Sequence, residues 1–304
     1  MSIELVVPEE VELEYLLFEL RKLSWIAADV LKAYARGIEP PYGFPKALTV
    51  QEGGEGPVST ADMAINELLI SGLKEKFPLV QWDILSEESA KERKLKNQAS
   101  NFDWQWILDP LDGTKDFLQG SENYAVHLAL AYKKKPKIGI VVIPERDELW
   151  FGIIGREAWY ENHKGVKKSV CFSDRKEISR LINVSSKNHQ GEILQNLLKE
   201  LKFGQTKNIG SVGCKVATIL RGESDVYISL SGETSPKDWD MAAPHAVIEA
   251  AGGSFSHADG RSLSYDKSDY SQRGCLIASH GKSHENICHK IMSFMSKNEP
   301  EYSV

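Results

Sequence analysis

The feature that most constrains the fold is a series of apolar runs between residues 104 and 162, each separated from the next by a short polar turn. Four of these runs read YAVHLALAY, IGIVVIP, LWFGIIG and AWYEN. Short runs rich in β-branched and aromatic residues, joined by tight turns, predict an antiparallel meander. The chain must therefore bury a large sheet, and helices must cover that sheet.

Segments with helical periodicity accompany the meander. Apolar residues recur at helical spacing over residues 12–36, and a second helix is predicted over 61–76. Beyond the meander, single strands alternate with helices. The pattern predicts a mixed α/β (α+β) chain with a cleft between two halves, an α+β half over 1–165 and an α/β half over 166–304.

Composition excludes several classes of protein. The 304 residues include 37 Lys+Arg and 43 Asp+Glu, which gives a net charge of −6. The protein as a whole therefore lacks the positive charge that would attract nucleic acid. No apolar run reaches the roughly 18–20 residues that a membrane span needs, and the acidic start lacks the features of a secretory signal. The four cysteines show no paired spacing, which fits free thiols in a reducing cytoplasm. We therefore expect a soluble cytoplasmic protein that binds neither nucleic acid nor a membrane.

The most informative segment reads WQWILDPLDGTKDF. A predicted strand ends at Asp109, and Asp112 follows three residues later, with the backbone carbonyl of Leu111 between them. These hard oxygen donors suit Mg²⁺. Gly113 and Thr114 then open a helix, whose free N–H groups and dipole form an anion site. Metal ligands beside a phosphate-sized anion site indicate phosphoryl chemistry.

Further carboxylates accompany this segment. Glu87 and Glu88 follow a predicted strand which, if parallel to the next one, would bring Glu87 beside Asp109. Asp62 and Asp240 each stand at the start of a predicted helix. Each carboxylate taken alone also has an ordinary structural interpretation as a turn residue, a helix cap or a solvated acidic loop. The combination, in this order, favours a functional site.

In this order the motifs resemble the lithium-sensitive, magnesium-dependent phosphatases of the inositol monophosphatase superfamily. The resemblance covers roughly residues 15–280 and rests on four motifs, VSTAD at 58–62, SEES at 86–89, DPLDGT at 109–114, and WD at 239–240 followed by AAGG at 250–253. It implies a layered α/β/α/β/α sandwich of the inositol monophosphatase and fructose-1,6-bisphosphatase type. The metal cluster would lie between the two halves.

The resemblance also implies a role for each matched residue. The ligands of two or three Mg²⁺ ions would be Glu87, Asp109, the carbonyl of Leu111, Asp112 and Asp240. Thr114 and Asp62 match the catalytic pair that positions and deprotonates the attacking water, and Glu88 matches a helper near the third metal. The residues on the substrate side would be Gly113, Thr114, Lys115, Gly210, Ser211 and Lys215.

The substrate class follows from the residues after the DGT motif. Lys115, Asp116 and Phe117 are similar to the corresponding stretch of bacterial 3′(2′),5′-bisphosphate nucleotidases, whereas inositol monophosphatases more often carry Asn before that Phe. The implied reaction is Mg²⁺-dependent removal of the 3′-phosphate of adenosine 3′,5′-bisphosphate, a small phosphorylated partner. Lys215 would then hold the second phosphate, unless it is an ordinary solvated lysine.

Several alternatives stay open at this stage. Hydrolysis of inositol 1-phosphate or of fructose 1,6-bisphosphate would use the same metal cluster, and a catalytically silent nucleotide-binding regulator is a rival of another class. Whether the chain forms a homodimer is also open. Three positions depart from the nucleotidase pattern and leave the leaving-group preference undecided: QEGGEG at 51–56, His127, and SSKNH at 185–189.

A second candidate site lies near the C-terminus. Four residues there could bind zinc, and they are His280, His284, Cys288 and His289. An ordinary surface helix is the favoured interpretation, because a chain of this length has no need of a structural metal.

Overall fold

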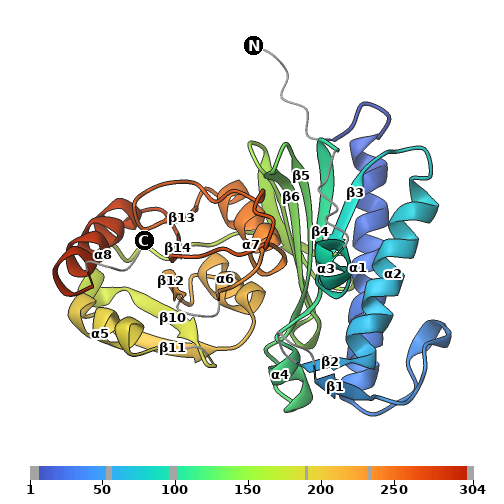
Figure 1. The fold of residues 1–304 in the computed structure, drawn as a ribbon, viewed down its shortest axis with the longest axis horizontal. Helices are drawn as coiled ribbons and strands as arrows, with labels where there is room; N and C mark the ends of the chain where they lie inside the picture. Colours follow the sequence, from blue (N-terminus) through green and yellow to red (C-terminus); the bar gives the residue numbers. More distant parts are fainter. Residues whose placement is uncertain (1–6, 53–56, 96–101, 189–190, 232–234, 300–304) are drawn as a thin grey trace.

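The fold is a sandwich of two β-sheets and three helical layers (Figure 1). The computed structural model describes residues 7–52, 57–95, 102–188, 191–231 and 235–299. One outer layer holds α1 (Leu13–Ala35) and α2 (Thr60–Lys76), the middle layer holds α6 (Val212–Leu220) and α7 (Asp238–Ala250), and the other outer layer holds α5 (Glu192–Leu201) and α8 (His284–Asn298). The predicted α/β/α/β/α architecture is confirmed.

The larger sheet has seven strands in sequential order. They are β3 (Asp83–Ser86), β4 (Trp104–Asp112), β5 (Ala125–Tyr132), β6 (Lys135–Ile143), β7 (Glu148–Ile153), β8 (Glu157–Glu161) and β9 (Lys167–Ser169). From β4 onward every neighbour is antiparallel, which confirms the predicted meander. β3 and β4 run parallel, with Ser86 opposite Leu108, so the residues that follow both strands lie at one edge of the sheet.

The smaller sheet has five strands in the order β11-β10-β12-β14-β13. Their bounds are β10 (Ile182–Ser186), β11 (Gln205–Ile209), β12 (Val226–Leu230), β13 (Ser254–His257) and β14 (Cys275–Ser279). β10 pairs in parallel with β11 and β12, and β14 is antiparallel to β12 and β13. The chain therefore passes from one sheet to the other between β9 and β10.

Each interface between layers has its own apolar core. The first lies between the larger sheet and α1 and α2, the second between the two sheets around α6 and α7, and the third between the smaller sheet and α5 and α8. Helix α7 approaches the meander unusually closely. A Cβ at Gly139 would lie 2.5 Å from the Ala243 carbonyl oxygen, and one at Gly152 would lie 2.6 Å from the Val247 Cα. These glycines let α7, which carries Asp240, pack directly onto the larger sheet.

Local patterns mispredicted one segment. Residues 89–100 read as an exposed loop, but α3 spans Glu87–Leu95, and residues 96–101 lie outside the described part of the chain. The helix is anchored by Arg93, which bonds both carboxylate oxygens of Asp83 at 2.7 and 2.6 Å. This tertiary contact leaves no trace in local periodicity, which is why the sequence pattern missed the helix.

The remaining elements are short. The Gly- and Pro-rich break after the first helix contains the hairpin β1 (Val50–Glu52) and β2 (Pro57–Ser59), and α4 spans Thr114–Leu118. Three 3₁₀ turns cover Pro41–Gly43, Pro144–Arg146 and Ile178–Arg180. Within the described ranges, no helix combines the length and the apolar character needed to cross a membrane.

Candidate active site

A bulge in β4 brings two carboxylates to the same place. Side chains alternate along a strand, so residues three apart would normally point to opposite faces. Asp109 lies opposite His127 and Asp112 opposite Ala125, so three steps on β4 correspond to two steps on β5. The extra residue resets the alternation, and Pro110 is tolerated because the ladder is interrupted there. The strand therefore continues through Asp112, and the prediction that it ends at Asp109 is wrong.

Two further carboxylates converge on this bulge from other elements. Asp240 stands in the first turn of α7, and its Oδ2 accepts a hydrogen bond of 2.6 Å from the Lys237 backbone N–H. Ligand oxygens of Asp109, Asp112 and Asp240 lie within 4.8 Å of one another, the spacing of a metal site. Glu87 begins α3 directly after β3 and lies beside Asp109, because the preceding residues Ser86 and Leu108 are paired in the sheet. The predicted meeting of Glu87 and Asp109 at the ends of parallel strands is confirmed.

The carboxylates of this cluster repel one another, and a bound cation would offset that repulsion. Burial, followed by repulsion from Glu87 and Asp112, raises the pKa of Asp109 well above its usual range. Burial, followed by repulsion from Asp240 and Glu88, does the same to the pKa of Glu87. Burial and the charge of Asp112 raise the pKa of Asp240 to about 6. Buried like charges are costly unless they are paired or coordinate metal, and these all-oxygen donors fit a hard divalent cation such as Mg²⁺.

Asp112 differs from its neighbours because several groups hold its charge. Burial alone would raise its pKa, but His127, Lys215 and Ser211 together lower that pKa to about 2. Its Oδ2 accepts hydrogen bonds from Ser211 Oγ at 2.6 Å and from the Gly213 N–H at 3.0 Å, and it lies 3.2 Å from His127 Nε2. From the sequence, His127 stands out only as a departure from the nucleotidase pattern. Its place opposite Asp109 in the hairpin register was the signal that could have tied it to the cluster.

Asp62 and Thr114 form a hydrogen-bonded pair beside the cluster. Thr114 Oγ1 lies 3.0 Å from Asp62 Oδ1 and 3.0 Å from the Leu111 carbonyl oxygen, and it can donate to either acceptor. The other Asp62 oxygen accepts a bond of 2.8 Å from the Ser59 N–H, as the first turn of α2 requires for a capping box. Burial raises the pKa of Asp62 even though hydrogen bonds from Ser59 and Thr114 oppose that shift. Asp62 is therefore both a cap and a partner of Thr114.

The predicted substrate residues fall into two groups. Gly113 and Lys115 belong to the start of α4, a helix of five residues, and Lys115 is exposed. Gly210, Ser211 and Lys215 lie in and just after the turn between β11 and α6, and all three are buried.

Lys215 does not reach open solvent. Its side chain is only 3% exposed, its Nζ donates a hydrogen bond of 3.1 Å to the Gly210 carbonyl oxygen, and it lies 5.2 Å from the centre of the Tyr227 ring. The interpretation of Lys215 as an ordinary solvated lysine is therefore wrong. Its contact with a second phosphate stays a prediction. Burial lowers the pKa of Lys215, and the nearby charge of Asp112 opposes that shift and favours the charged form.

His280 and His284, near the C-terminus, have protein partners. His284 lies in the first turn of α8 between two hydroxyls, with Nε2 2.8 Å from Ser256 Oγ and Nδ1 2.9 Å from Ser279 Oγ. Cys288 is buried against the third core. In the described ranges, the only group of three His, Cys, Asp or Glu side chains close enough to share a metal is the acidic one above. These contacts favour the interpretation of this segment as an ordinary packed helix.

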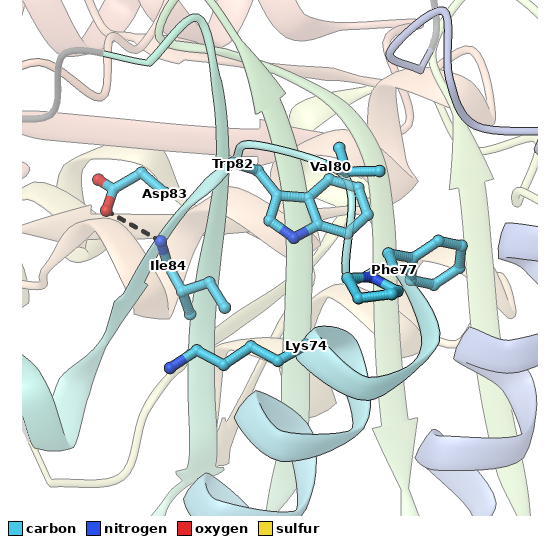
Figure 2. Close-up of a pocket in the computed structure, with 7 residues that line it drawn as sticks. Lys74, Phe77, Val80, Trp82, Asp83 and Ile84 are labelled. Carbon is cyan, nitrogen blue, oxygen red and sulfur yellow. Dashed lines mark hydrogen bonds between the residues drawn. The ribbon is translucent and has the colours of Figure 1, made fainter.

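A cavity of about 490 Å³ lies at the C-terminal end of α2 (Figure 2). It is lined by the end of α2 and the segment that leads into β3, including Phe77, Val80 and Trp82. Lys74 on its rim is twelve residues beyond Asp62 along α2, a distance of about 18 Å at the helical rise. The cavity and the acidic cluster therefore occupy opposite ends of the same helix.

The cluster predicts how metal binding depends on pH. A carboxyl whose pKa is raised in the folded state keeps its proton there, so the free energy of unfolding falls as pH rises from the ordinary pKa toward the folded one. A cation that replaces these protons removes the penalty, which is largest above the folded pKa of about 6 for Asp240. We expect the gain in Tm from excess MgCl₂ over EDTA to be small near pH 5 and to grow through about pH 8. Thermal melts in MgCl₂ and in EDTA at each pH give this gain in Tm. The histidines elsewhere change the Tm equally in both conditions, so they do not contribute to the difference. A gain in Tm that does not change with pH would contradict the prediction.

A largely buried carboxylate cluster between two sheets, with a hydroxyl–carboxylate pair beside it, fits a metal-dependent phosphatase, and the family match places the protein in that class. The particular family follows from comparison with known sequences. A profile of the inositol monophosphatase family matches residues 12–296, and the chain belongs to that family.

Individual relatives agree with this assignment. The chain is 32% identical over 211 residues to the 3′(2′),5′-bisphosphate nucleotidase CysQ of Salmonella typhimurium, covering 69% of this chain and 80% of that protein. It is 29% identical over 212 residues to the putative Nus factor SuhB of Neisseria meningitidis serogroup B, covering 67% and 74%. The fold is that of the IMPase of Thermotoga maritima, with a TM-score of 0.72 at 18% identity over 94% of this chain and 99% of that one.

Proposed function

We propose that this phosphatase removes the 3′-phosphate of adenosine 3′,5′-bisphosphate, giving AMP and inorganic phosphate. The observation that carries the proposal is the acidic cluster with the Asp62–Thr114 pair beside it, in a chain whose relatives include a bisphosphate nucleotidase. Glu87, Asp109, the Leu111 carbonyl, Asp112 and Asp240 are the proposed ligands of two or three Mg²⁺ ions. Bound Mg²⁺ would supply Lewis acidity toward the phosphate and a lower pKa for water.

The protein's own groups would handle the water proton. Thr114 Oγ1 has one proton and two acceptors at 3.0 Å, Asp62 Oδ1 and the Leu111 carbonyl. If the Leu111 oxygen faces a cation, the hydroxyl donates to Asp62 and keeps its lone pairs to accept a hydrogen bond from the attacking water. Asp62 is the terminal proton acceptor of this pair, and its raised pKa makes it a better base than a solvated carboxylate. Glu88 is proposed as a helper beside Glu87.

Substrate choice depends on the groups available for a second phosphate. A protein of net charge −6 needs local cations for a doubly phosphorylated substrate. Lys115 is exposed in the first turn of α4, next to Thr114, and is the better placed of the two predicted lysines, because Lys215 is buried. The Gly113 and Thr114 amides and the turn at Gly210 and Ser211 are proposed to hold the rest of the substrate.

A phosphate-release panel tests the proposed substrate. We expect kcat/KM for adenosine 3′,5′-bisphosphate to exceed that for inositol 1-phosphate at least about tenfold, or about 1.4 kcal/mol, which is a modest demand on one charge-assisted contact. Fructose 1,6-bisphosphate serves as the third substrate, and each reaction is repeated in EDTA. Equal or better hydrolysis of inositol 1-phosphate would assign the protein to the sugar-phosphate branch and leave the metal chemistry intact.

The same panel separates an enzyme from a silent regulator. The relative described as a putative Nus factor is the observation that keeps this second function in view. A silent regulator would release no phosphate from any of the three substrates in Mg²⁺ and would still bind a nucleotide. The presence of every matched carboxylate and of the Thr114 hydroxyl favours the enzyme.

A further inference from the structure

Asp116 joins the two halves of the molecule. It lies on α4, which belongs to the N-terminal half, and its side chain is 1% exposed. Its Oδ2 accepts a hydrogen bond of 3.0 Å from Asn188 Nδ2, and its Oδ1 lies 3.5 Å from Lys187 Nζ. Both partners follow β10 in the C-terminal half. A buried carboxylate on a short helix therefore contacts a segment from the other sheet.

The same carboxylate packs against Gly210. A Cβ on Gly210 would lie 2.2 Å from Asp116 Oδ2 and 2.4 Å from its Cγ, so any side chain there would collide with Asp116. The φ of Gly210 lies outside the left-handed region, so its backbone conformation does not require glycine. The close approach of the Asp116 carboxylate therefore explains why position 210 is a glycine.

The residue after Gly210 holds the candidate metal ligand Asp112. Ser211 has a φ of 40°, which is strained for a residue with a side chain. Its Oγ accepts a bond of 3.1 Å from the Cys214 N–H and donates one of 2.6 Å to Asp112 Oδ2, which fixes the direction of the hydroxyl proton. The turn formed by Gly210 and Ser211 therefore lies between two carboxylates, Asp116 on one side and Asp112 on the other.

We propose that Asp116 is a positioning residue for the metal site. By holding Gly210 it keeps Ser211 in its strained conformation, and Ser211 in turn holds Asp112 Oδ2 so that the other oxygen of Asp112 is left for a cation. Without Asp116 the turn relaxes toward an ordinary negative φ, and Asp112 loses a charge-assisted hydrogen bond. The inference rests on the proposed metal role of Asp112.

Direct measurement of metal binding tests this role. We expect Asp116→Ala to weaken Mg²⁺ binding, measured by isothermal titration calorimetry, by about tenfold, the lower end of the cost of losing a group behind a metal ligand. Phosphate release by this variant should recover as the Mg²⁺ concentration rises. Asp116→Asn keeps the shape of the side chain and an acceptor for Asn188, so it should restore most of the affinity.

The contact with Gly210 provides a reciprocal test. Gly210→Ala places a methyl group against the Asp116 carboxylate and should weaken Mg²⁺ binding in the same way. Adding Asp116→Ala to that variant removes the collision together with the support of the turn, so the double variant should bind Mg²⁺ about as weakly as Asp116→Ala alone, and the two losses should not add. Gly191→Ala is the matched control, because Gly191 also has an ordinary φ and a Cβ there would meet nothing within 4 Å.

Each outcome distinguishes this inference from the proposed function. Wild-type protein that binds no Mg²⁺ overturns the proposed metal site and the inference with it. Normal wild-type binding with unchanged affinity in Asp116→Ala and Gly210→Ala overturns the inference alone, even if both variants melt earlier. Should Asp116→Ala fail to fold, Asn188→Ala removes one partner from the surface, and unchanged Mg²⁺ affinity in that variant and in Gly210→Ala overturns the inference.

Discussion

Asp109→Asn is expected to reduce kcat for phosphate release by at least about a thousandfold, because phosphoryl transfer depends on electrostatic stabilisation and one well-placed cation is worth 10³–10⁵. Asp109 is 1% exposed and lies at the centre of the carboxylate cluster, beside Glu87 and Asp112. The asparagine keeps the shape of the side chain but removes the negative charge that a cation would need. Steady-state kinetics with a range of Mg²⁺ concentrations measures the loss.

The same variant should be more stable than the wild type in the absence of metal. Burial and repulsion raise the pKa of Asp109, which means that its charged form destabilises the metal-free fold. Asn cannot carry that charge, so we expect a higher Tm than wild type in EDTA and a smaller gain on adding Mg²⁺. This opposite movement of activity and stability separates a metal ligand from a residue that only holds the fold together.

A surface variant controls for the substitution itself. Asp103→Asn changes a side chain that is 61% exposed, just before the start of β4, and should leave kcat and Tm unchanged. Full activity of Asp109→Asn, or full activity of wild type in excess EDTA, would show that the carboxylate cluster does not hold a catalytic metal.

Much of this arrangement could be predicted because it depends on patterns of residues that are close together in the sequence. The apolar runs specify the strands of the meander, and residues that follow two parallel strands must meet at one edge of the sheet. The meeting of Glu87 and Asp109 followed from that rule alone. Asp62 and Asp240 were placed correctly at the starts of α2 and α7, because carboxylates are favoured in the first turn of a helix.

The rest depends on contacts between distant segments. Pro110 after Asp109 reads as a turn, and only the pairing of β4 with β5 shows that it lies in a bulge. The burial of Lys215 and the contact of Asp116 with Gly210 arise from packing between the two halves, in which partners are some 90 residues apart in sequence. Neither periodicity nor motif spacing carries that information.

The contacts of His127 also could not be predicted from the sequence. A histidine inside an apolar strand is read most simply as a core residue, and it is indeed fully buried. Its Nε2 nevertheless lies 3.2 Å from Asp112 Oδ2, and its Nδ1 lies 3.3 Å from the Trp239 carbonyl oxygen, next to Asp240. The ring thus contacts one candidate ligand and the residue before another, so a departure from the nucleotidase pattern lies against the acidic cluster.

Thr114→Ala and Asp62→Asn are each expected to lower kcat by about 10²–10⁴-fold while changing Mg²⁺ affinity and KM far less, since positioned proton transfer contributes that much to rate. The two side chains share the hydrogen bond from Thr114 Oγ1 to Asp62 Oδ1, so the variants should be strongly non-additive. A double variant no slower than the worse single variant would show that the pair acts as a unit. Single-turnover and steady-state kinetics provide the measurement.

The capping box of α2 gives this prediction its sharpest control. Asp62 also accepts the Ser59 N–H, so Asp62→Ala, which removes the acceptor, should cost about 1 kcal/mol of stability as a lost cap, whereas Thr114→Ala leaves that cap intact. Thr114→Ser, which keeps the hydroxyl, should retain most of the activity. A lower Tm with unchanged kcat in Asp62→Ala, together with full activity in Thr114→Ala, would reduce both residues to structural roles. Because only Asp62 is in the cap, loss of activity in both variants with loss of stability in one identifies the shared hydrogen bond as the functional element.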